Sequence, residues 1–272
     1  MKRFIPEPIA FNQAHFLVLQ HTAEVATYID EHKELLLREN PGRNEAWIAR
    51  AHMKSFNIWF RDRMHTSNSS TGESLENLAK GPLFTITSYQ GYDINGYTFD
   101  TFAQDQKSTY QNSGVRIDAL DNNMQQTVYY GQIEEIWEHT YSGFKIPIFR
   151  CRWVHGTKGV MKDKYGFMTV DLGQVGYKEE PFVLADQVSQ VFYVPDTRNK
   201  KRHVVLPGKR RIVGVENAVD EEEYNQFDEV PPFGACTIPK ILPSEKTPYL
   251  RTDHKEGVNV GKSRRKRRVN KE

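Results

Sequence analysis

Carboxylates and imidazoles are the side chains of this sequence whose spacing could serve acid–base or metal chemistry. Glu134, Glu135 and Glu138 stand close together in YYGQIEEIWEH, and general acid–base catalysis or a hard metal ion requires such paired carboxylates. An even spacing places Glu134 and Glu138 on one face of a strand. No His or Asp motif accompanies them, so we expect a solvated strand face. The run Glu221–Glu223 is likewise expected to be solvated.

The nine histidines follow no metal-binding pattern. His15 and His21 are six residues apart, which puts them on different faces of a helix. His32 and His52 fall on the apolar faces of two predicted helices, where we expect hydrogen-bonded core imidazoles. The sequence contains no HExxH motif, no phosphate-binding glycine loop and no GxSxG motif. It therefore predicts no metal site, no cofactor and no small-molecule substrate. The enzymatic alternative is a nuclease or transposase acting alone, which would require a metal-dependent carboxylate cluster.

The cysteine pattern and the hydropathy indicate the cellular compartment of the protein. Cys151 and Cys236 lie far apart, outside any CxxC or zinc-ligand spacing, and Cys151 is expected to be a small buried hydrophobe. No apolar stretch is long enough to cross a bilayer. We expect a soluble intracellular protein of a reducing compartment, without a membrane partner.

Aromatic residues recur in the strand-like segments. Two or three rings can surround a methylated lysine, because ring faces attract the cation. Tyr129, Trp137 and Trp153 are the candidates for such a cage, with Phe192 and Tyr193 nearby in the same predicted module. The other interpretation places these rings in the core.

Basic clusters are the strongest indication of a binding function. Two clusters bracket the segment HVVL, and they predict a nucleic-acid-binding surface: Lys200, Lys201, Arg202, Lys209, Arg210 and Arg211. The C-terminal cluster has the composition of a nuclear-import signal or a basic arm: Arg264, Arg265, Lys266, Arg267 and Arg268. No recognition-helix motif or zinc finger is present, so the expected DNA contact is independent of base sequence.

Apolar periodicity predicts an α+β protein. Residues 9–65 carry three- and four-residue spacing typical of helices, and a brief helix is expected at 74–80. From Leu83 the period becomes two, with strand-like runs that end at HVVL. Residues 104–124 are polar and are predicted to form a loop. Several short strands with regular turns favour a small antiparallel barrel or a curled sheet.

We therefore expect four regions along the chain. They are a short helical fragment at 1–65, a linker at 66–82, a β-rich module at 83–211, and a disordered tail at 212–272 that is first acidic and then basic.

The β-rich segments resemble a known family. YYGQIEEIWEHTYSGFKIPIFRCRWV, GFMTVDLGQVGYKEEPFVLADQVSQVFYVPD and RHVVLPGKRR resemble the C-terminal domain of unknown function in plant CACTA (En/Spm-type) transposase polyproteins. SYQGYDINGYTFDTFAQDQKSTYQNSGV resembles the segment before that domain. AHFLVLQHTAEVATYIDEHKELL through FNIWFRDRM resembles the tail of an uncharacterised domain that follows the catalytic domain. The resemblance covers residues 10–211 in the same order.

The resemblance implies a transposon-derived protein. Nothing in the chain resembles the acidic-triad catalytic domain of that family, so we expect a non-enzymatic nuclear protein. It would assist weak, sequence-independent association with DNA or chromatin proteins and would use the nuclear-import machinery. One alternative is a chromatin, histone or protein-interaction module built on the β segments. Another is a degenerate relic without selected function.

Overall fold

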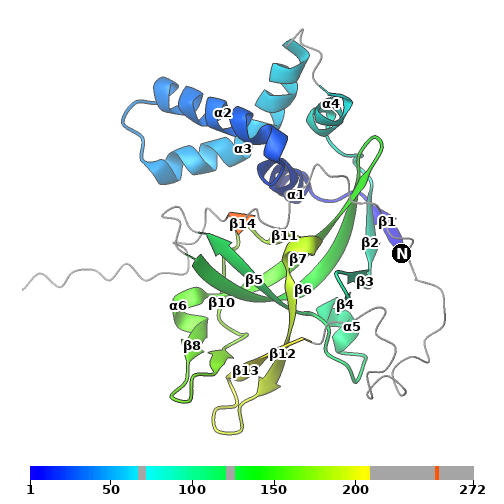
Figure 1. The fold of residues 1–272 in the computed structure, drawn as a ribbon, viewed down its shortest axis with the longest axis vertical. Coiled ribbons are helices and arrows are strands. Elements are labelled where there is room, and N and C mark those ends of the chain that lie inside the picture. The colour runs from blue at the N-terminus through cyan, green and yellow to red at the C-terminus, as the bar shows by residue number, and fades with distance from the viewer. Residues whose placement is uncertain (67–71, 121–125, 209–248, 251–272) are drawn as a thin grey trace, which may run out of the picture.

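The helices and the sheet occupy opposite parts of the molecule. The computed structural model describes residues 1–66, 72–120 and 126–208, together with the backbone of residues 249–250. Helices gather at the N-terminal side of the sequence, and most of the later described residues belong to an antiparallel sheet (Figure 1). The α+β prediction is confirmed. The tail predicted to be disordered lies outside the described residues, apart from that two-residue backbone.

The helical part begins with Pro8 at the first position of a helix, where its missing N–H costs no hydrogen bond. Asn44 caps α3, because its Oδ1 accepts a hydrogen bond of 2.9 Å from the Trp47 N–H. The helices are α1 (Pro8–Gln20), α2 (Ala26–Glu39), α3 (Glu45–Thr66) and α4 (Glu73–Lys80), with a 3₁₀ turn at Ala23–Val25. Shorter turns are α5 (Phe102–Asp105), α6 (Gly156–Gly159) and a 3₁₀ turn at Ala185–Gln187.

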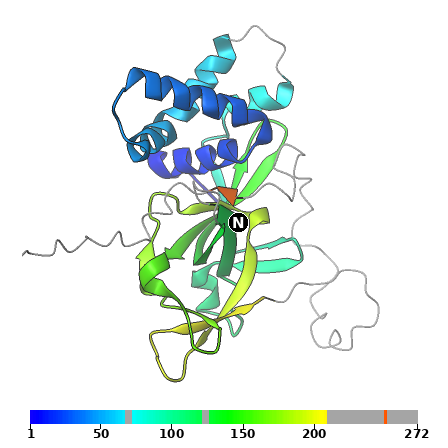
Figure 2. The same ribbon diagram turned by 60° about the vertical axis from the view of Figure 1, so that its left-hand side comes forward.

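Helix α1 lies between the α2–α3 pair and the sheet (Figures 1 and 2). Its Gln13 side chain donates to the Glu179 carbonyl, 3.0 Å away, just before strand β11. No helix among the described residues has the length and apolar character that crossing a membrane requires.

The sheet is built around a long pair of neighbouring strands, β6 (Gln126–Thr140) and β7 (Lys145–Val154). The other strands are β1 (Lys2–Phe4), β2 (Ile86–Tyr89), β5 (Gly114–Leu120), β8 (Val160–Lys162), β9 (Met168–Val170), β10 (Val175–Gly176), β11 (Phe182–Leu184), β12 (Ser189–Pro195), β13 (His203–Pro207) and β14 (Tyr249–Leu250). Strands β3 (Gly91–Ile94) and β4 (Tyr97–Asp100) form a separate hairpin.

The main sheet is open. One path of paired strands runs β1-β2-β6-β5-β12-β13-β9-β8, and β7 lies on the other edge of β6 with β10 and β11 beyond it. All of these pairs are antiparallel except β14 with β5. Because the pairing does not return on itself, the barrel alternative is wrong and the curled-sheet alternative stands.

Strand β5 corrects the prediction of a loop at 104–124. Val115, Ile117 and Ala119 alternate with more exposed neighbours and are all at most 1% exposed. Their apolar side chains pack in the core while the strand pairs with β6. The polar residues on either side concealed this short alternation.

The helices and the central strands share one continuous cluster of buried residues. Phe16 and Phe56 on α1 and α3 belong to the same cluster as Trp137 and Phe149 on β6 and β7. The N-terminus is also part of the sheet, because Phe4 of β1 pairs with Ile86 of β2. The expected helical fragment therefore contributes to the same core as the β-rich module.

Candidate nucleic-acid interface

The loop between β8 and β9 is held by its first residue. The Asp163 carboxylate accepts hydrogen bonds of 2.8 Å from the N–H groups of Tyr165 and Phe167. The backbone closes the same turn, since the Asp163 N–H donates to the Phe167 carbonyl at 2.8 Å. Gly166 has φ of 92°, a conformation that favours glycine. This pattern matches a type I turn with Asp first and Gly last, and it fixes the direction of residues 164–167.

The loop between β12 and β13 is held in the same way. Asp196 accepts from the Arg198 N–H at 2.8 Å, and Asn199 accepts from the Lys201 N–H at 3.2 Å. The Asp196 N–H donates to the Arg202 carbonyl at 2.9 Å. The Asp196 and Asn199 side chains therefore hold their own turn through backbone hydrogen bonds.

Tertiary structure brings the two hairpins together. Strand β13 pairs with β9, with His203 opposite Val170. The Arg198 guanidinium carbon lies 6.0 Å from the centroid of the Tyr165 ring, although the two residues are far apart in the chain. Both views place these hairpins at the end of the molecule away from helices α1, α2, α3 and α4 (Figures 1 and 2). We call residues 162–167 and 196–202 the hairpin loops.

The hairpin loops are strongly basic. They contain six cations and two carboxylates, a net charge of +4: Lys162, Lys164, Arg198, Lys200, Lys201 and Arg202, against Asp163 and Asp196. All of these cations except Arg202 are exposed. Among the described residues, none of the six takes part in an ion pair.

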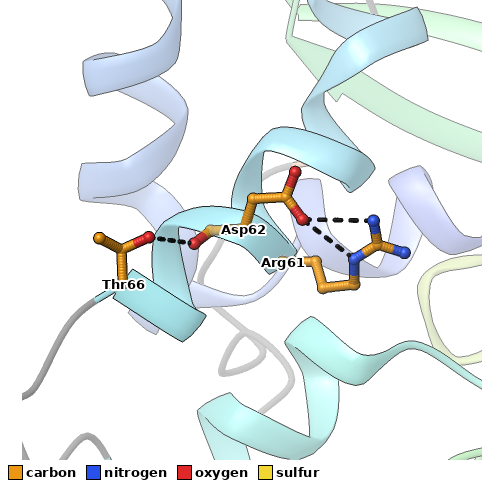
Figure 3. Close-up of polar contacts among 3 residues, drawn as sticks. All are labelled: Arg61, Asp62 and Thr66. Atoms are coloured by element: carbon orange, nitrogen blue, oxygen red, sulfur yellow. Dashed lines mark hydrogen bonds and ion pairs between the residues drawn. The ribbon is translucent and has the colours of Figure 1, made fainter.

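The cations at the end of α3 differ from those of the hairpin loops. Figure 3 shows Arg61 paired with its neighbour Asp62 at 3.2 Å, while Thr66 donates to the Asp62 carbonyl at 2.8 Å. Arg63 is paired with Glu31 at 2.8 Å. These charges are satisfied within the helical part, whereas the five exposed cations of the hairpin loops have no ion-pair partner among the described residues.

Two aromatic rings accompany the exposed cations. Tyr165 is 64% exposed and Phe167 is 54% exposed. The Lys164 ammonium lies 4.9 Å from the Tyr165 ring centroid, so this ring has cations from both loops beside it.

The predicted basic residues fall into two groups. Lys200 and Lys201 are exposed in the second loop. Arg202 is half-buried, and its Nη1 lies 3.3 Å from the Thr169 hydroxyl, so it joins β13 to β9. The remaining predicted residues lie outside the described residues: Lys209, Arg210, Arg211, Arg264, Arg265, Lys266, Arg267 and Arg268.

Sequence reasoning missed the first loop. Lys162, Lys164, Tyr165 and Phe167 stand in the segment MKDKYGF, where the D-x-x-G pattern of a type I turn was the available signal. That pattern predicts a hairpin with exposed central residues. Its position beside residues 196–202 follows only from the pairing of β9 with β13.

The proposed aromatic cage lies in the core. Tyr129, Trp137 and Trp153 are each at most 2% exposed. Trp153 packs where Gly131 leaves space, because a Cβ on Gly131 would lie 2.7 Å from the indole. Buried rings cannot receive a ligand cation, so the core interpretation fits these three residues.

Glu134 is exposed as expected, but Glu135 is half-buried and Glu138 is buried, so the three carboxylates do not share one solvated strand face. A β-bulge between Ile133 and Glu135 places one extra residue, Glu134, in β6, and the even spacing no longer fixes the faces. Glu138 is 4% exposed and accepts a hydrogen bond of 2.8 Å from Lys145. Glu135 pairs with Arg150 at 2.6 Å. Glu135 and Glu138 therefore make cross-strand contacts.

Histidines are a second concentration of titratable groups. The Nδ1 atoms of His32 and His52 are 2.7 Å apart, so one imidazole donates to the other, as expected for core residues. His15 bonds to the Tyr141 hydroxyl at 2.9 Å. Burial lowers the pKa of His15, His52 and His139 to about 3 and keeps them neutral at pH 7. Within the described residues, no group of three His, Cys, Asp or Glu side chains could hold a metal ion.

The fold and this surface define an α+β protein with an open antiparallel sheet and a basic, aromatic pair of hairpins. Residues 137–205 match the family model described as "Domain of unknown function (DUF4216)", a segment that includes both hairpin loops. No curated protein and no solved structure matches the chain. The C-terminal β segments therefore match a domain of unknown function, as the sequence resemblance suggested for this region.

Proposed function

We propose that this protein is a non-enzymatic nucleic-acid-binding protein whose contact surface is formed by the hairpin loops. The observation that carries the proposal is the meeting of five exposed cations from two loops, without an ion pair to a described residue. Such cations can replace the counterions of a phosphate backbone, which supplies most of the sequence-independent affinity for DNA. The hairpins present no helix for reading base edges in the major groove, which favours binding independent of sequence.

The proposal includes a nuclear, transposon-derived origin. The resemblance of residues 10–211 to the C-terminal region of CACTA transposase polyproteins supports this origin, and so does the composition of residues 264–268. Replacing the basic residues of 264–268 by Gln should shift a fluorescent fusion of the full chain from the nucleus to the cytoplasm. An unchanged nuclear signal would contradict the import role.

The test of DNA binding is fluorescence anisotropy of the full chain with a labelled duplex, over a salt series. The hairpin variant carries Arg198→Gln, Lys200→Gln and Lys201→Gln. A matched control removes one Arg and two Lys from exposed positions of α2 and α3: Arg38→Gln, Lys33→Gln and Lys54→Gln. Each variant is also made with Gln at residues 264–268, so that the C-terminal cluster does not mask the hairpin loops.

Loss of three phosphate contacts should make the log–log salt slope shallower by about 2.7, at about 0.9 per contact. We expect the hairpin variant to bind more weakly by several-fold for each lost contact at about 0.1 M salt, whatever the duplex sequence. The control variant should bind within about twofold of its parent. Equal affinity and equal slope for the hairpin variant and its parent would show that the hairpin loops do not contact DNA.

A further inference from the structure

The side chains of Tyr165 and Phe167 are exposed to solvent on a loop that is held by its own hydrogen bonds. Each ring is more than half exposed, although removing such a ring from water is favourable. The Asp163 carboxylate holds the N–H groups of both residues at 2.8 Å. The loop is therefore ordered before any ligand arrives, which lowers the entropy lost on binding.

The chemistry around these rings selects the ligand. The hairpin loops carry a net charge of +4, so the ligand is anionic. Exposed aromatic faces favour a flat apolar partner. A nucleic acid supplies both features, because each nucleotide joins a phosphate to a base with a π-face.

Access to the base faces decides whether the preferred nucleic acid is single-stranded or a duplex. In a duplex each base is already stacked between its neighbours, and a side chain reaches a face only by separating a base step. In a single strand the faces can be turned outward and stacked on protein rings. Positive grooves lined with aromatic residues are the usual means of binding single strands.

We propose that the hairpin loops prefer single-stranded nucleic acid, with bases stacking on Tyr165 and Phe167. Lys164 and Arg198, which lie beside the Tyr165 ring, contact the phosphates of the stacked nucleotides. Lys162 and Lys200 extend the positive surface along each loop. This inference rests on the proposed nucleic-acid binding at the same loops.

The test compares two labelled probes with the full chain carrying Gln at residues 264–268. One probe is an oligo(dT) of about 20 nucleotides, which covers the site sizes usual for single-strand binding. The other is a duplex of the same length. The ring variant carries Tyr165→Ala and Phe167→Ala, and the conservative variant carries Tyr165→Phe. The hairpin variant defined above (Arg198→Gln, Lys200→Gln and Lys201→Gln) is measured in parallel as the charge variant.

Loss of the rings should weaken oligo(dT) binding by at least about fivefold for each ring, the lower end of measured base stacking. Duplex binding should change by less than about twofold, and Tyr165→Phe should retain single-strand affinity. Polyglutamate, an anion without bases, should displace labelled oligo(dT) only weakly when it is added at equal charge. The inference is overturned if the ring variant binds both probes as its parent does, or if polyglutamate competes as well as oligo(dT). In either case, weaker binding of the charge variant than of its parent would still support the proposed function. Failure of the charge variant to weaken either probe would overturn both.

Discussion

The helical end and the hairpin end of the molecule differ in the burial of their titratable side chains. At the helical end, imidazoles are packed among aromatic rings: His52 lies 4.7 Å from Phe56 and 4.9 Å from His32, between ring centroids. At the hairpin end, lysine and arginine side chains are exposed to solvent, and the neighbouring rings of Tyr165 and Phe167 are exposed as well.

Burial is what separates structural groups from groups that can bind. A buried imidazole loses the solvent that stabilises its charge, so its pKa falls and it serves as a packed neutral ring. An exposed cation keeps its charge and costs the fold little, so it is available to a ligand. Mutations at the helical end should therefore change stability, and mutations at the hairpin end should change binding.

Phe56→Ala and Phe167→Ala give the largest contrast. Phe56 is fully buried on α3 and contacts the rings of Phe16, His52 and Phe60. Its truncation should lower the free energy of unfolding by about 3–5 kcal/mol, because it leaves a cavity. Phe167→Ala should change that free energy by less than about 0.5 kcal/mol. Urea titrations followed by circular dichroism measure both values, and similar losses would contradict the comparison.

Acid should weaken the fold through the buried imidazoles. The pKa values of His15, His52 and His139 are lowered to about 3 in the fold, and the unfolded chain titrates near 6.5. Between those values the unfolded state binds more protons, so stability is complete above about pH 6.5 and is lost as the pH falls. From about pH 7.5 to about pH 5.5 the three together should lower the free energy of unfolding by up to about 4 kcal/mol. Urea titrations at both pH values check this.

His139→Phe isolates one of these imidazoles. Neither ring nitrogen of His139 has a hydrogen-bond partner among the described residues, and the ring is stacked against Phe11 and Trp137. A phenyl ring cannot take up a proton, so the loss between the two pH values should shrink by about 1.4 kcal/mol. His65→Gln, at an exposed position of α3, is the control for the replacement of a histidine outside the core. An unaltered loss in His139→Phe would remove this residue from the acid response.

Lys145→Met and Lys162→Met separate a structural lysine from a binding one. The Lys145 ammonium is 2.8 Å from the buried Glu138 carboxylate, which would lose its partner. We expect the free energy of unfolding to fall by about 1–3 kcal/mol, the usual range for an unsatisfied buried polar group. Lys162→Met should leave stability within about 0.5 kcal/mol and weaken DNA binding. Thermal melts measure the stability of both variants, and anisotropy measures their DNA binding. A stability loss in Lys162→Met together with weaker DNA binding in Lys145→Met would contradict both assignments.

Arg61→Ala should have the smallest effect. Its ion pair with Asp62 joins neighbouring residues on the surface, with both side chains about half exposed or more (Figure 3). Such pairs contribute about 0–1 kcal/mol, and DNA binding should not change. A clear loss of DNA affinity in this variant would extend the binding surface to the helical end.

Local patterns predicted the elements well where apolar spacing was regular. His32 and His52 were predicted to lie on the apolar faces of two helices, and both are buried, on α2 and α3. Cys151 on β7 was also predicted to be buried. The bulge at Glu134 was not, because it depends on the register between β6 and β7.

The α+β character, the helix ends and the basic composition of residues 200–202 could be predicted from the sequence alone. These features depend on periodicity, capping and charge, which act over a few residues. Tertiary structure decided that Arg198 lies beside Tyr165, that Glu138 is buried and that the sheet stays open. Each of these outcomes depends on which strands become neighbours. Strand pairing joins residues far apart in the chain, and no local pattern records the choice.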